Sequence, residues 1–527
     1  MYGFWQVVII LLLAACTWLF LKSCSFIIPV HRTKFISVPV FATLPLLLWI
    51  AFSPLYNGLP FTQLSEARSP IEGNHTVRPW GDTFECYPTY IKYPATLLEL
   101  RNVVKKAKNV RVVGGGHSFS PLICTNETLI SLKNMTNITE ITNTTVTAYA
   151  GASIESVMSA LLPKGRVLHG FGSVQDQTLA GAFSTSQHGL QRKNFAYHVV
   201  ELSAVLADGT LFKTTNLTYW KASLGLLGVI YEMKLNTHAE TMVRVERLKM
   251  HIDDALEGLY NAEGGCVWAS WNGRLDQVIL NRYTSVSDPV VRKYPVQTHQ
   301  FESMMLDTVA MPILSFFPPL ADINLMFLYA ENTTTVKHIS SAWSHHAEYG
   351  LMYTAYIVPK QHCKTVLKEI EYSGQNVVNI LVRFVEKEEV GCLSLFQQDS
   401  CVIDIYSLQF QPTLRAFHSH VEKVVGDYGG HSHWGKFMVT NNQTRNLSCF
   451  SEFQAYVRAI DPEGKFQNNY TTALFHSRPP VYENFNRYTA GVFVWRWFTV
   501  FLFLWCAFAI FFDRINGGPV FKRLHDA

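Results

Sequence analysis

Short hydrophobic runs separated by glycine-containing turns fill the central part of the chain. Such turns include Gly114-Gly115-Gly116, Gly170-Phe171-Gly172 and Leu224-Gly225. Apolar runs of this length between turn residues predict short strands and a few helices, the first helix over residues 95–107. They are not typical of regularly alternating strands and long helices. The pattern therefore predicts an α+β fold and argues against a Rossmann sheet.

Three longer apolar stretches lie near the two ends of the chain, at residues 5–21, 36–52 and 491–512. Each is long enough, or nearly so, to cross a hydrocarbon core of about 30 Å as a helix. A cleaved signal peptide is the alternative for the first stretch, but no positive charge precedes it, which favours a retained span. The sequence thus predicts flanking transmembrane helices and makes the lipid bilayer a partner of the chain.

Charges beside these stretches predict the orientation. Lys22, Arg32 and Lys34 lie between the first two, and Arg514, Lys522 and Arg523 follow the third. The positive-inside bias places both segments in the cytosol and the body between them in the lumen. Ten N-x-[ST] sequons all lie in that body, at Asn74, Asn126, Asn134, Asn137, Asn143, Asn216, Asn332, Asn442, Asn446 and Asn469. We therefore expect a glycoprotein of the endoplasmic reticulum or another secretory membrane, with a lumenal body.

A fourth apolar stretch, residues 304–329, is interrupted by prolines and by Asp307 and Asp322. Proline pairs and carboxylates argue against a membrane span. A fourth crossing would also place Asn442 and Asn446 on the side opposite to the other sequons. We expect an insert that lies on the lumenal leaflet or packs on the substrate-binding part of the protein.

Composition narrows the class of ligand. The chain has 527 residues, 48% of them hydrophobic, and a formal net charge of only +4, which gives no indication of nucleic-acid binding. Lys105, Lys106, Lys108 and Arg111 form one cluster, which we interpret as a solvated face at the end of the first helix. His431 and His433 lack Cys or carboxylate partners at ligand spacing, so we expect no metal site.

Seven of the ten cysteines fall in the predicted lumenal body, where disulfides are permitted. An odd number leaves at least one of them unpaired. Cys392 and Cys401 flank a predicted hairpin turn at residues 397–399 and are candidates for one bridge, although a buried free thiol is an equally ordinary outcome.

The segment Gly114-Gly115-Gly116-His117-Ser118 directly follows the apolar run at residues 110–113. Three glycines let a backbone pass close to a bulky anionic ligand, and the histidine offers a nucleophilic ring nitrogen at the same place. The chain has no G-x-G-x-x-G behind a strand, no P-loop and no H-E-x-x-H, so nicotinamide, nucleoside-triphosphate and zinc chemistry lose their usual motifs. A different cofactor, held by backbone groups and attached to His117, is the hypothesis.

Several motifs together resemble a known family. They are Trp80 with Cys86-Tyr-Pro, the run from Arg111 to Ser118, Gly172-Ser-Val-Gln-Asp-Gln-Thr-Leu-Ala-Gly181, Leu381-Val-Arg-Phe384, Phe396-Gln-Gln-Asp-Ser-Cys401, His433-Trp-Gly-Lys436 and Asp461-Pro-Glu-Gly-Lys-Phe-Gln-Asn468. In order and spacing they are similar to the aldonolactone oxidoreductases, the L-gulonolactone and D-arabinonolactone oxidase group of the vanillyl-alcohol-oxidase type of FAD proteins. The resemblance extends from about residue 80 to about residue 470.

This resemblance implies FAD as the cofactor. The matching positions for FAD binding are Val113, Gly114, Gly115, Gly116, His117, Ser118, Gly172, Ser173, Asp176, Gly181, His188, Gly228 and Ile230. His117 matches the histidine that is attached covalently to the flavin in the family. Gly172 matches a position where a small residue leaves a path for O2, which implies an oxidase that produces H2O2. The plain alternative for either residue is a role in a tight turn.

Arg383 and Lys436 match the two cations that the family uses beside the substrate, and the resemblance implies that they are catalytic. The alternative for Arg383 is an ordinary ion pair with Glu386, Glu388 or Glu389, and the alternative for Lys436 is a solvated loop. Both are cations in otherwise apolar surroundings, which favours an anionic or enolate-like partner.

Two departures from the family pattern affect these expectations. Ser184 and Ser186 replace two glycines near the expected pyrophosphate position, and Leu381 stands where the family has a glutamate two residues before the arginine. Residues i and i+2 share a strand face, so that glutamate would reach the same place as Arg383, whereas Glu386 would point to the opposite face. Either a base comes from elsewhere, the substrate differs, or catalysis is lost. Restoring the glutamate with Leu381→Glu is expected to raise turnover.

The predicted organisation is two N-terminal transmembrane helices (1–53), an FAD-binding domain (77–240), an antiparallel substrate cap (241–425) with the insert at 304–329, a C-terminal return (426–475), a third transmembrane helix (491–512) and a cytosolic tail (513–527). The predicted function is oxidation of an aldono-1,4-lactone by O2 to H2O2 and an ascorbate-type product. The alternatives are a flavin oxidase of another sugar or alcohol, and a non-catalytic glycoprotein that keeps the flavin fold.

Overall fold

A computed structural model describes residues 70–72, 75–79, 81, 83–270, 278–286, 333–339, 351–371, 377–389, 391–408, 414–440, 447–476 and 478–479. The expected spans at residues 5–21, 36–52 and 491–512 and the insert at 304–329 lie outside these ranges, as does Trp80. Among the helices within the ranges, none is both long and apolar enough to cross a membrane.

A three-stranded parallel sheet opens the described part of the chain. Its order is β3 (Tyr90–Lys92), β5 (Thr128–Ser131) and β4 (Val110–Val113), and the short pair β1 (Ile71–Glu72) and β2 (Thr76–Val77) precedes it. Helix α4 (Leu97–Lys106) connects β3 to β4, which confirms the helix predicted over residues 95–107. The Thr96 side chain accepts a hydrogen bond from Glu99 N–H at 3.2 Å and so caps the helix. Leu100 and Val104 bury the inner face of α4.

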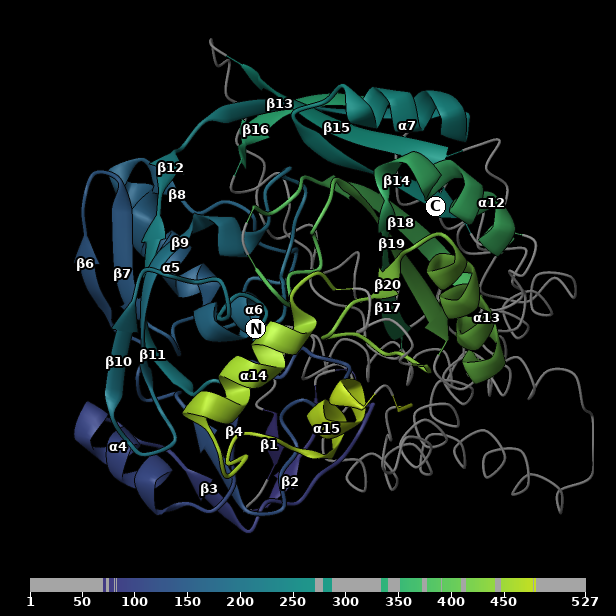
Figure 1. The fold of residues 1–527 in the computed structure, drawn as a ribbon. Coiled ribbons are helices and arrows are strands. Elements are labelled where there is room, and N and C mark those ends of the chain that lie inside the picture. Colours follow the sequence, from purple (N-terminus) through teal and green to yellow (C-terminus); the bar gives the residue numbers. More distant parts are fainter. Residues whose placement is uncertain are drawn as a thin grey trace, which may run out of the picture. The chain divides into compact units, whose positions relative to one another are not determined.

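A five-stranded antiparallel sheet completes the N-terminal half. Its order is β10 (Leu211–Thr214), β9 (Val199–Val205), β11 (Val229–Asn236), β7 (Thr145–Tyr149) and β6 (Ile138–Ile141). The connections contain α5 (Ile154–Leu161), η1 (Leu162–Lys164), α6 (Leu179–Ser184), η2 (Phe195–His198) and the pair β8 (Arg166–Val167) and β12 (His238–Ala239). In Figure 1 the strands of this sheet lie on the left of the molecule, in blue to teal.

An eight-stranded sheet forms the other half, and all its pairings are antiparallel, as the sequence predicts for the cap. Its order is β16 (Thr333–His338), β13 (Met242–Met250), β15 (Val278–Val286), β14 (Gly264–Ser270), β18 (Val377–Val385), β19 (Ser400–Leu408), β17 (Leu351–Pro359) and β20 (His431–Ser432). Helices α7 (Ile252–Tyr260), α12 (Cys363–Glu371) and α13 (Leu414–Asp427) cover one face, and η5 (Lys360–His362) precedes α12.

The two faces of this sheet belong to different cores. On β18, Ile380, Val382 and Phe384 pack with α7, α12 and α13. The alternate residues Leu381 and Val385 pack in the larger core, which also contains the N-terminal half. Because side chains alternate along a strand, Arg383 shares the face of Leu381 and points toward the N-terminal half.

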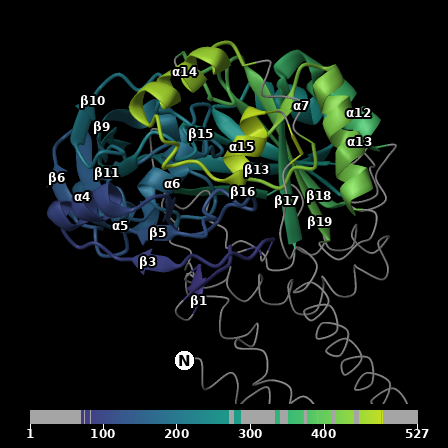
Figure 2. The same cartoon turned by 60° about the horizontal axis from the view of Figure 1, so that its bottom comes forward.

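The chain ends its described part with α14 (Phe450–Ile460) and α15 (Asn469–Phe475), drawn in yellow in Figures 1 and 2. This segment returns to the start of the N-terminal half, where the Val110 N–H donates to Lys465 O at 2.8 Å. The Asn109 amide donates to Lys465 O at 3.0 Å and to Gln467 O at 2.8 Å. The return therefore holds together residues about 350 positions apart in the sequence.

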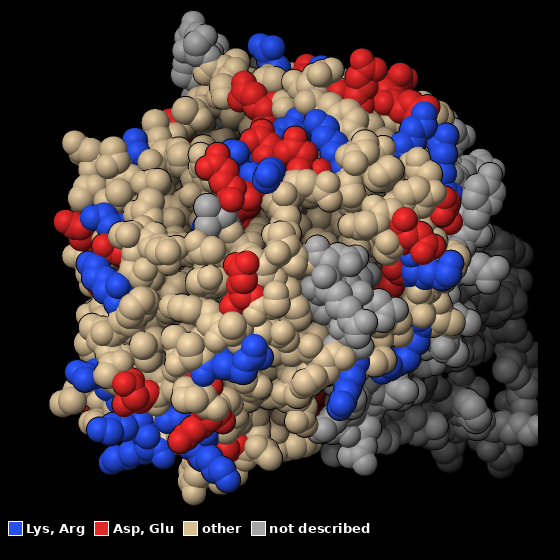
Figure 3. All heavy atoms as spheres, viewed as in Figure 1, with Lys and Arg blue, Asp and Glu red and all other residues tan. Residues whose placement is uncertain are grey.

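Charges of both signs are interspersed on the face of the molecule in Figure 3, with uncharged surface between them. Lys105, Lys106 and Lys108 are exposed, as expected for a solvated helix end. Arg111 is not part of that face, because its side chain is buried. The expectation for Arg111 was therefore wrong: it lies on β4, whose side chains point into the interior.

Three disulfides are present among the described residues: Cys86–Cys124, Cys363–Cys401 and Cys392–Cys449. Cys266 is buried and unpaired, as the odd cysteine count requires. The candidate bridge between Cys392 and Cys401 is wrong. Cys401 lies on β19 with its side chain toward the helical layer, where Cys363 begins α12, whereas Cys392 precedes the turn and meets Cys449 at the start of α14.

Candidate active site

The glycine loop after β4 is packed tightly against a second loop. A Cβ on Gly114 would collide with the Thr178 hydroxyl, and one on Gly115 would lie 3.0 Å from Asp176 O and 3.0 Å from the His117 ring. Gly116 has a φ of +72°, which favours glycine. The residue types of this loop are thus dictated by its close approach to residues 176–178.

Asp176 and His117 meet across these two loops, with Asp176 Oδ1 2.9 Å from His117 Nε2. Thr178 then caps α6, accepting from Gly181 N–H at 3.3 Å. Asp176 therefore lies on the Nε2 side of the ring, and Nδ1 is on the other side.

The two loops fit a group that needs backbone donors. Within the described residues, none accepts a hydrogen bond from the N–H of Gly115, Gly116, Gly172 or Ser173, and all four residues are only half-buried. Backbone N–H groups that converge from two loops are suited to bind phosphate oxygens. Ser118 lies at the end of the first loop, beside Gly435. Val113 is different, because its side chain is buried in the core under β4 and only its backbone faces the loop.

The segment from Gly225 to Ile230 lies next to β4. A Cβ on Gly225 would lie 3.7 Å from the Arg111 guanidinium, and Leu224 N–H donates to Ser184 O at 3.0 Å. Gly228 packs against β9, since a Cβ there would lie 2.7 Å from Val205 O, and Ile230 is buried on β11. Gly228 and Ile230 thus have a packing role that requires no ligand.

The two serines that replace family glycines differ in conformation. Ser184 ends α6 in helical conformation, which any residue can adopt. Ser186 has a φ of +58°, in the left-handed region that favours glycine, and its side chain is buried. The backbone path therefore follows the family pattern at residue 186, and the serine carries strain there.

Arg383 on β18 is buried and forms an ion pair with Asp404 on β19. The sequence left Arg383 without a carboxylate on its own strand, and proposed Glu386, Glu388 or Glu389 for an ordinary ion pair. The partner is on the neighbouring strand instead, and the proposed pairs with Glu386 and Glu388 are wrong, because Glu386 pairs with Lys193 at 2.9 Å and Glu388 with Lys221 at 2.9 Å.

His188 is the other contact of Arg383. The guanidinium donates from Nη1 to His188 O at 3.2 Å, and Nη2 lies 3.0 Å from His188 Nε2. Since arginine has only donors, Nε2 accepts and Nδ1 carries the proton, which it donates to Ser186 O at 3.2 Å. Burial, and then the charge of Arg383, holds the pKa of His188 well below its usual range, so this imidazole is neutral.

His433 lies beside His188, with ring centroids 5.4 Å apart. Its Nδ1 accepts from Gly435 N–H at 3.0 Å, and the ring also bonds the Ser186 carbonyl. Burial, and then the charge of Lys436, holds its pKa well below the ordinary value. His188 and His433 are thus both neutral, and both donate to the Ser186 carbonyl oxygen. Neither ring adds a positive charge beside Arg383 and Lys436.

Lys436 is held over two aromatic rings, with Nζ 5.2 Å from the Phe119 centroid and 5.4 Å from the Tyr353 centroid. Burial lowers the pKa of Lys436 to about 8, while attraction to Asp404 raises it and repulsion from Arg383 lowers it. The ammonium is therefore the main form at neutral pH but is easily deprotonated. The solvated-loop alternative does not describe this residue.

The C-terminal return brings Lys436 to the glycine loop. Phe119 N–H donates to Gly435 O at 2.8 Å, and the Ser120 hydroxyl donates to Trp434 O at 2.7 Å. Arg111 donates to the carbonyl oxygens of Leu122, Leu224 and Phe466, which joins this return to both halves of the N-terminal domain. Burial lowers the pKa of Arg111 to about 10.

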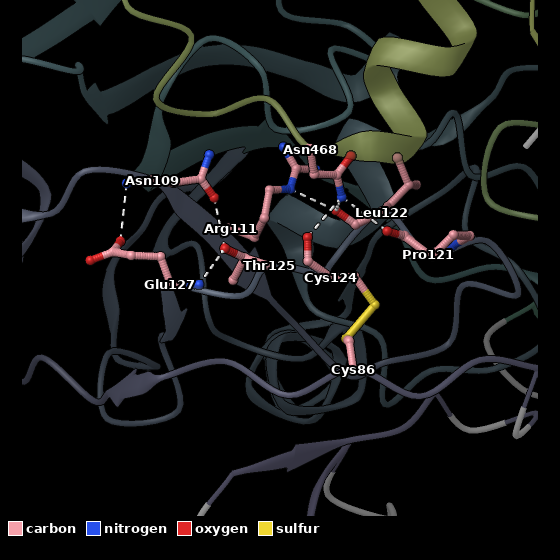
Figure 4. The surroundings of a disulfide bond; sticks show 9 residues. All are labelled: Cys86, Asn109, Arg111, Pro121, Leu122, Cys124, Thr125, Glu127 and Asn468. Atoms are coloured by element: carbon pink, nitrogen blue, oxygen red, sulfur yellow. Dashed lines mark hydrogen bonds between the residues drawn. A yellow bond between two sulfur atoms is a disulfide. The ribbon is translucent and has the colours of Figure 1, made fainter. Parts of the chain in front are cut away.

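Asn468 holds the loop behind the site (Figure 4). Its amide donates to Pro121 O at 3.0 Å, Leu122 O at 3.2 Å and Cys124 O at 2.9 Å, beside the Cys86–Cys124 disulfide. The motif that ends in Asn468 therefore acts as a structural clamp.

The structure brings Arg383, Lys436, His188 and the loops at residues 114–118 and 172–178 into one region. The sequence missed Asp404, His433 and Phe119 as members of it. Asp404 carried a usable signal, since it is a charged residue inside an otherwise apolar run, Val402-Ile403-Asp404-Ile405. Buried polar atoms here that find no hydrogen-bond partner within the described residues include Ser186 Oγ, Gln187 Oε1 and Arg383 Nε. Such atoms fit a site that is completed by a bound polar molecule.

Two family models match the chain. Residues 88–215 match the FAD binding domain, and residues 237–474 match D-arabinono-1,4-lactone oxidase. L-gulonolactone oxidase of Scyliorhinus torazame is 23% identical over 431 residues, which cover 75% of this chain and 97% of that protein. L-gulono-1,4-lactone dehydrogenase of Mycobacterium tuberculosis is 24% identical over 430 residues, covering 76% and 98%.

Over a shorter region, D-arabinono-1,4-lactone oxidase of Yarrowia lipolytica is 33% identical over 185 residues, covering 31% of this chain and 34% of that protein. Among solved structures, cholesterol oxidase from B. sterolicum superposes with a TM-score of 0.64 at 14% identity, covering 76% of this chain and 97% of that chain. At that identity the likeness concerns the fold.

Proposed function

The chain belongs to the aldonolactone oxidoreductase family and contains its FAD-binding domain, and from this premise we propose that it oxidises an aldono-1,4-lactone at the hydroxyl-bearing carbon next to the carbonyl. The acceptor is O2, and the products are H2O2 and an ascorbate-type compound. The observation that carries the proposal is the grouping of Arg383, Asp404 and Lys436 in front of the glycine loop.

Bound FAD supplies the acceptor for the hydride. Arg383 has fixed orientation, because Asp404 and His188 occupy both its Nη atoms, and Nε remains to donate to a substrate oxygen. Lys436 places a second positive charge nearby, where it stabilises negative charge on the lactone oxygens. The neutral rings of His188 and His433 line the same region and add no further charge.

His117 is the residue proposed to attach the flavin covalently. Asp176 Oδ1 lies 2.9 Å from its ring. The glycine loop directly precedes His117, and within the described residues no acceptor is bonded to the N–H groups of Gly115 and Gly116. The proposed contacts to the pyrophosphate come from Gly115, Gly116, Gly172 and Ser173.

A lactone panel tests the function. The purified protein, mixed without O2 with L-gulono-, L-galactono- or D-arabinono-1,4-lactone, is expected to lose its flavin absorbance at 450 nm with one of them, and to release H2O2 when air is admitted. A protein that contains flavin but is bleached by none of the three would refute the proposal.

Gly172 is proposed to admit O2. A Cβ there would lie 3.3 Å from Gln187 Nε2 and 3.4 Å from His188 O, so alanine fits with a small adjustment. Gly172→Ala is expected to reduce O2 consumption by about 10-fold or more and to leave reduction of an artificial dye nearly unchanged. Gly426→Ala, on α13, where a Cβ would meet no atom within 4 Å, is the control. Equal losses with both acceptors would instead indicate general damage to the site.

The body of the protein is proposed to be lumenal and membrane-anchored. Three disulfides favour an oxidising compartment. The described sequon asparagines Asn126, Asn134, Asn137, Asn143, Asn216 and Asn469 are all exposed, as glycan acceptors must be. Endoglycosidase is expected to increase gel mobility, and a C-terminal tag should be digested by protease in sealed microsomes. An unglycosylated protein with a protected tag would contradict this orientation.

A further inference from the structure

We propose that Asp404 takes the place of the glutamate that the family carries at position 381, so that the carboxylate has moved from β18 to the facing position on β19. The inference rests on the proposed function, because it concerns the same site. Asp404 is a positioning residue: it holds Arg383 and sets the balance of charge around Lys436.

The register of the two strands carries the inference. Leu381 and Asp404 are direct partners across β18 and β19. Arg383, two residues after Leu381 on the same face, is the direct partner of Val402. Direct partners in an antiparallel pair have Cβ atoms about 5 Å apart on the same face. A carboxylate at either position therefore reaches the same guanidinium, and from Asp404 it does so.

No other described carboxylate takes this role. Within the described ranges, the other hydrogen bonds of Arg383 go to the carbonyl oxygen and the neutral ring nitrogen of His188. Glu386 and Glu388, on the segment after β18, are paired with lysines. Without Asp404, the buried guanidinium would have no countercharge, which is strongly unfavourable in a dry site.

The count of charges is also preserved. Among the described residues, the charges that act on one another here are the cations Arg383 and Lys436 and the anion Asp404. Their sum is +1, as it would be with a glutamate at position 381 in place of Asp404. Asp404 attracts the Lys436 ammonium, while Arg383 repels it. The other groups that face Lys436 are the neutral His188 and His433 and the rings of Phe119 and Tyr353. One positive charge is thus left for the substrate.

This arrangement reverses the expected effect of Leu381→Glu. Leu381 is buried, and a glutamate there would face Asp404 directly. Two carboxylates on opposite positions repel each other and compete for one guanidinium. The single change is therefore expected to lower turnover, whereas the sequence alone predicted that it would raise it.

Four variants test the relocation: Asp404→Asn, Leu381→Glu, the double variant Leu381→Glu/Asp404→Asn, and the uncharged control Leu381→Gln/Asp404→Asn. Asp404→Asn is expected to lower kcat on the order of 100-fold, more than it raises KM, because a misoriented arginine affects the reacting geometry. The glutamate double variant should recover at least about 10-fold of that loss, and the glutamine control should recover none.

The pH profile separates positioning from mere stability. Because the pKa of Lys436 is lowered to about 8, kcat/KM is expected to fall above about that pH in the wild type. This alkaline limb is expected to move to lower pH in Asp404→Asn and to return in the glutamate double variant. FAD content and a cooperative melting curve establish folding of each variant. Asp404→Asn alone could fail to fold. In that case the relocation is supported if Leu381→Glu/Asp404→Asn folds and Leu381→Gln/Asp404→Asn does not.

Two results would overturn the inference. One is that Asp404→Asn has the same kcat and the same alkaline limb of kcat/KM as the wild type. The other is that the glutamine and glutamate double variants recover the same activity. If the wild type reacts with no lactone, the proposed function fails, and the relocation is then judged from melting temperatures. Leu381→Glu and Asp404→Asn should each lower the melting temperature while their combination restores it, and additive losses would reject the relocation independently of activity.

Discussion

At the scale of single residues, the chemistry depends on a few side chains whose neighbours determine their charge and orientation. His117 has Asp176 at one nitrogen, His188 has Arg383 at one nitrogen and the Ser186 carbonyl at the other, and Lys436 lies over two aromatic rings. For His188 the two contacts also fix which ring nitrogen carries the proton.

His117 is expected to be the site of covalent attachment, with Asp176 as its orienting partner. His117→Ala should release all flavin on acid precipitation and leave a colourless pellet. Asp176→Asn should still form the bond, but more slowly, because the ring loses the group that favours the proton on Nε2. Acid-stable flavin in each variant, followed by absorbance of the pellet over time, is the measurement. Acid-stable flavin in His117→Ala would exclude this residue.

Ser186 and Ser184 form a matched pair for a test of backbone strain. Ser186→Gly is expected to raise the free energy of unfolding by about 0.5–1 kcal/mol, because a left-handed φ suits glycine. Ser184→Gly, at the helical end of α6, should lower it by about 0.5–1 kcal/mol. Denaturant unfolding of both variants gives the comparison. Changes of the same sign at the two positions would show that conformation is not the cause.

The sequence predicted those residues that act through local chemistry. Glycines in the loop after β4 were visible because close packing and positive φ exclude other residues at these positions. Asp404 was not identified because its role depends on the register between β18 and β19, whose partners lie 23 positions apart at Leu381 and Asp404. The charge inside the apolar run marks Asp404 as unusual, but only the register shows that it faces Arg383.

At the scale of elements, periodicity predicted helix α4 and the family resemblance implied an antiparallel cap, but neither predicted the order of strands or the disulfide pairs. Cys363 and Cys392 belong to different layers, and only the sheet topology decides which of them meets Cys401. The sequence also did not predict the edge strand of the eight-stranded sheet. This strand, β20, belongs to the C-terminal return and pairs with β17.

The turn before α15 is an element whose contribution can be measured. Asn468→Asp keeps the oxygen that caps α15 through Thr471 N–H but replaces the donor that faces three carbonyl oxygens. We expect a loss of at least about 2 kcal/mol in the free energy of unfolding. Asn102→Asp, exposed on α4, is the control and should have little effect. An unchanged melting temperature in Asn468→Asp would remove the clamp role assigned to this residue.

At the scale of the whole molecule, buried histidines make stability depend on pH. Burial lowers the pKa of His418 to about 3, that of His198 to about 3 and that of His431 to about 4. The unfolded chain binds these protons near pH 6.5 and the folded chain does not. Stability is therefore full above pH 6.5 and is lost as the pH falls from there toward 4.

We expect the free energy of unfolding to be several kcal/mol lower at pH 5 than at pH 7.5, measured by urea titration. Glu422 opposes this, since burial raises its pKa to about 7, but it is one group against several. His418→Gln can keep partners in Tyr356 and Ser407 and should reduce the slope by up to about 1.4 kcal/mol per pH unit. Equal stability at both pH values would contradict this account.

The contact between Arg111 and Phe466 has a consequence for biosynthesis. These two residues are 355 positions apart, and Phe466 O is one of the three carbonyls that satisfy the buried guanidinium. At roughly 5–20 residues per second, a ribosome needs about 20–70 s between them. Throughout that interval one donor of the buried Arg111 guanidinium lacks the carbonyl oxygen that accepts from it in the folded protein. An unsatisfied buried donor costs about 1–3 kcal/mol, so the N-terminal half reaches its full stability only after residue 466 has been added.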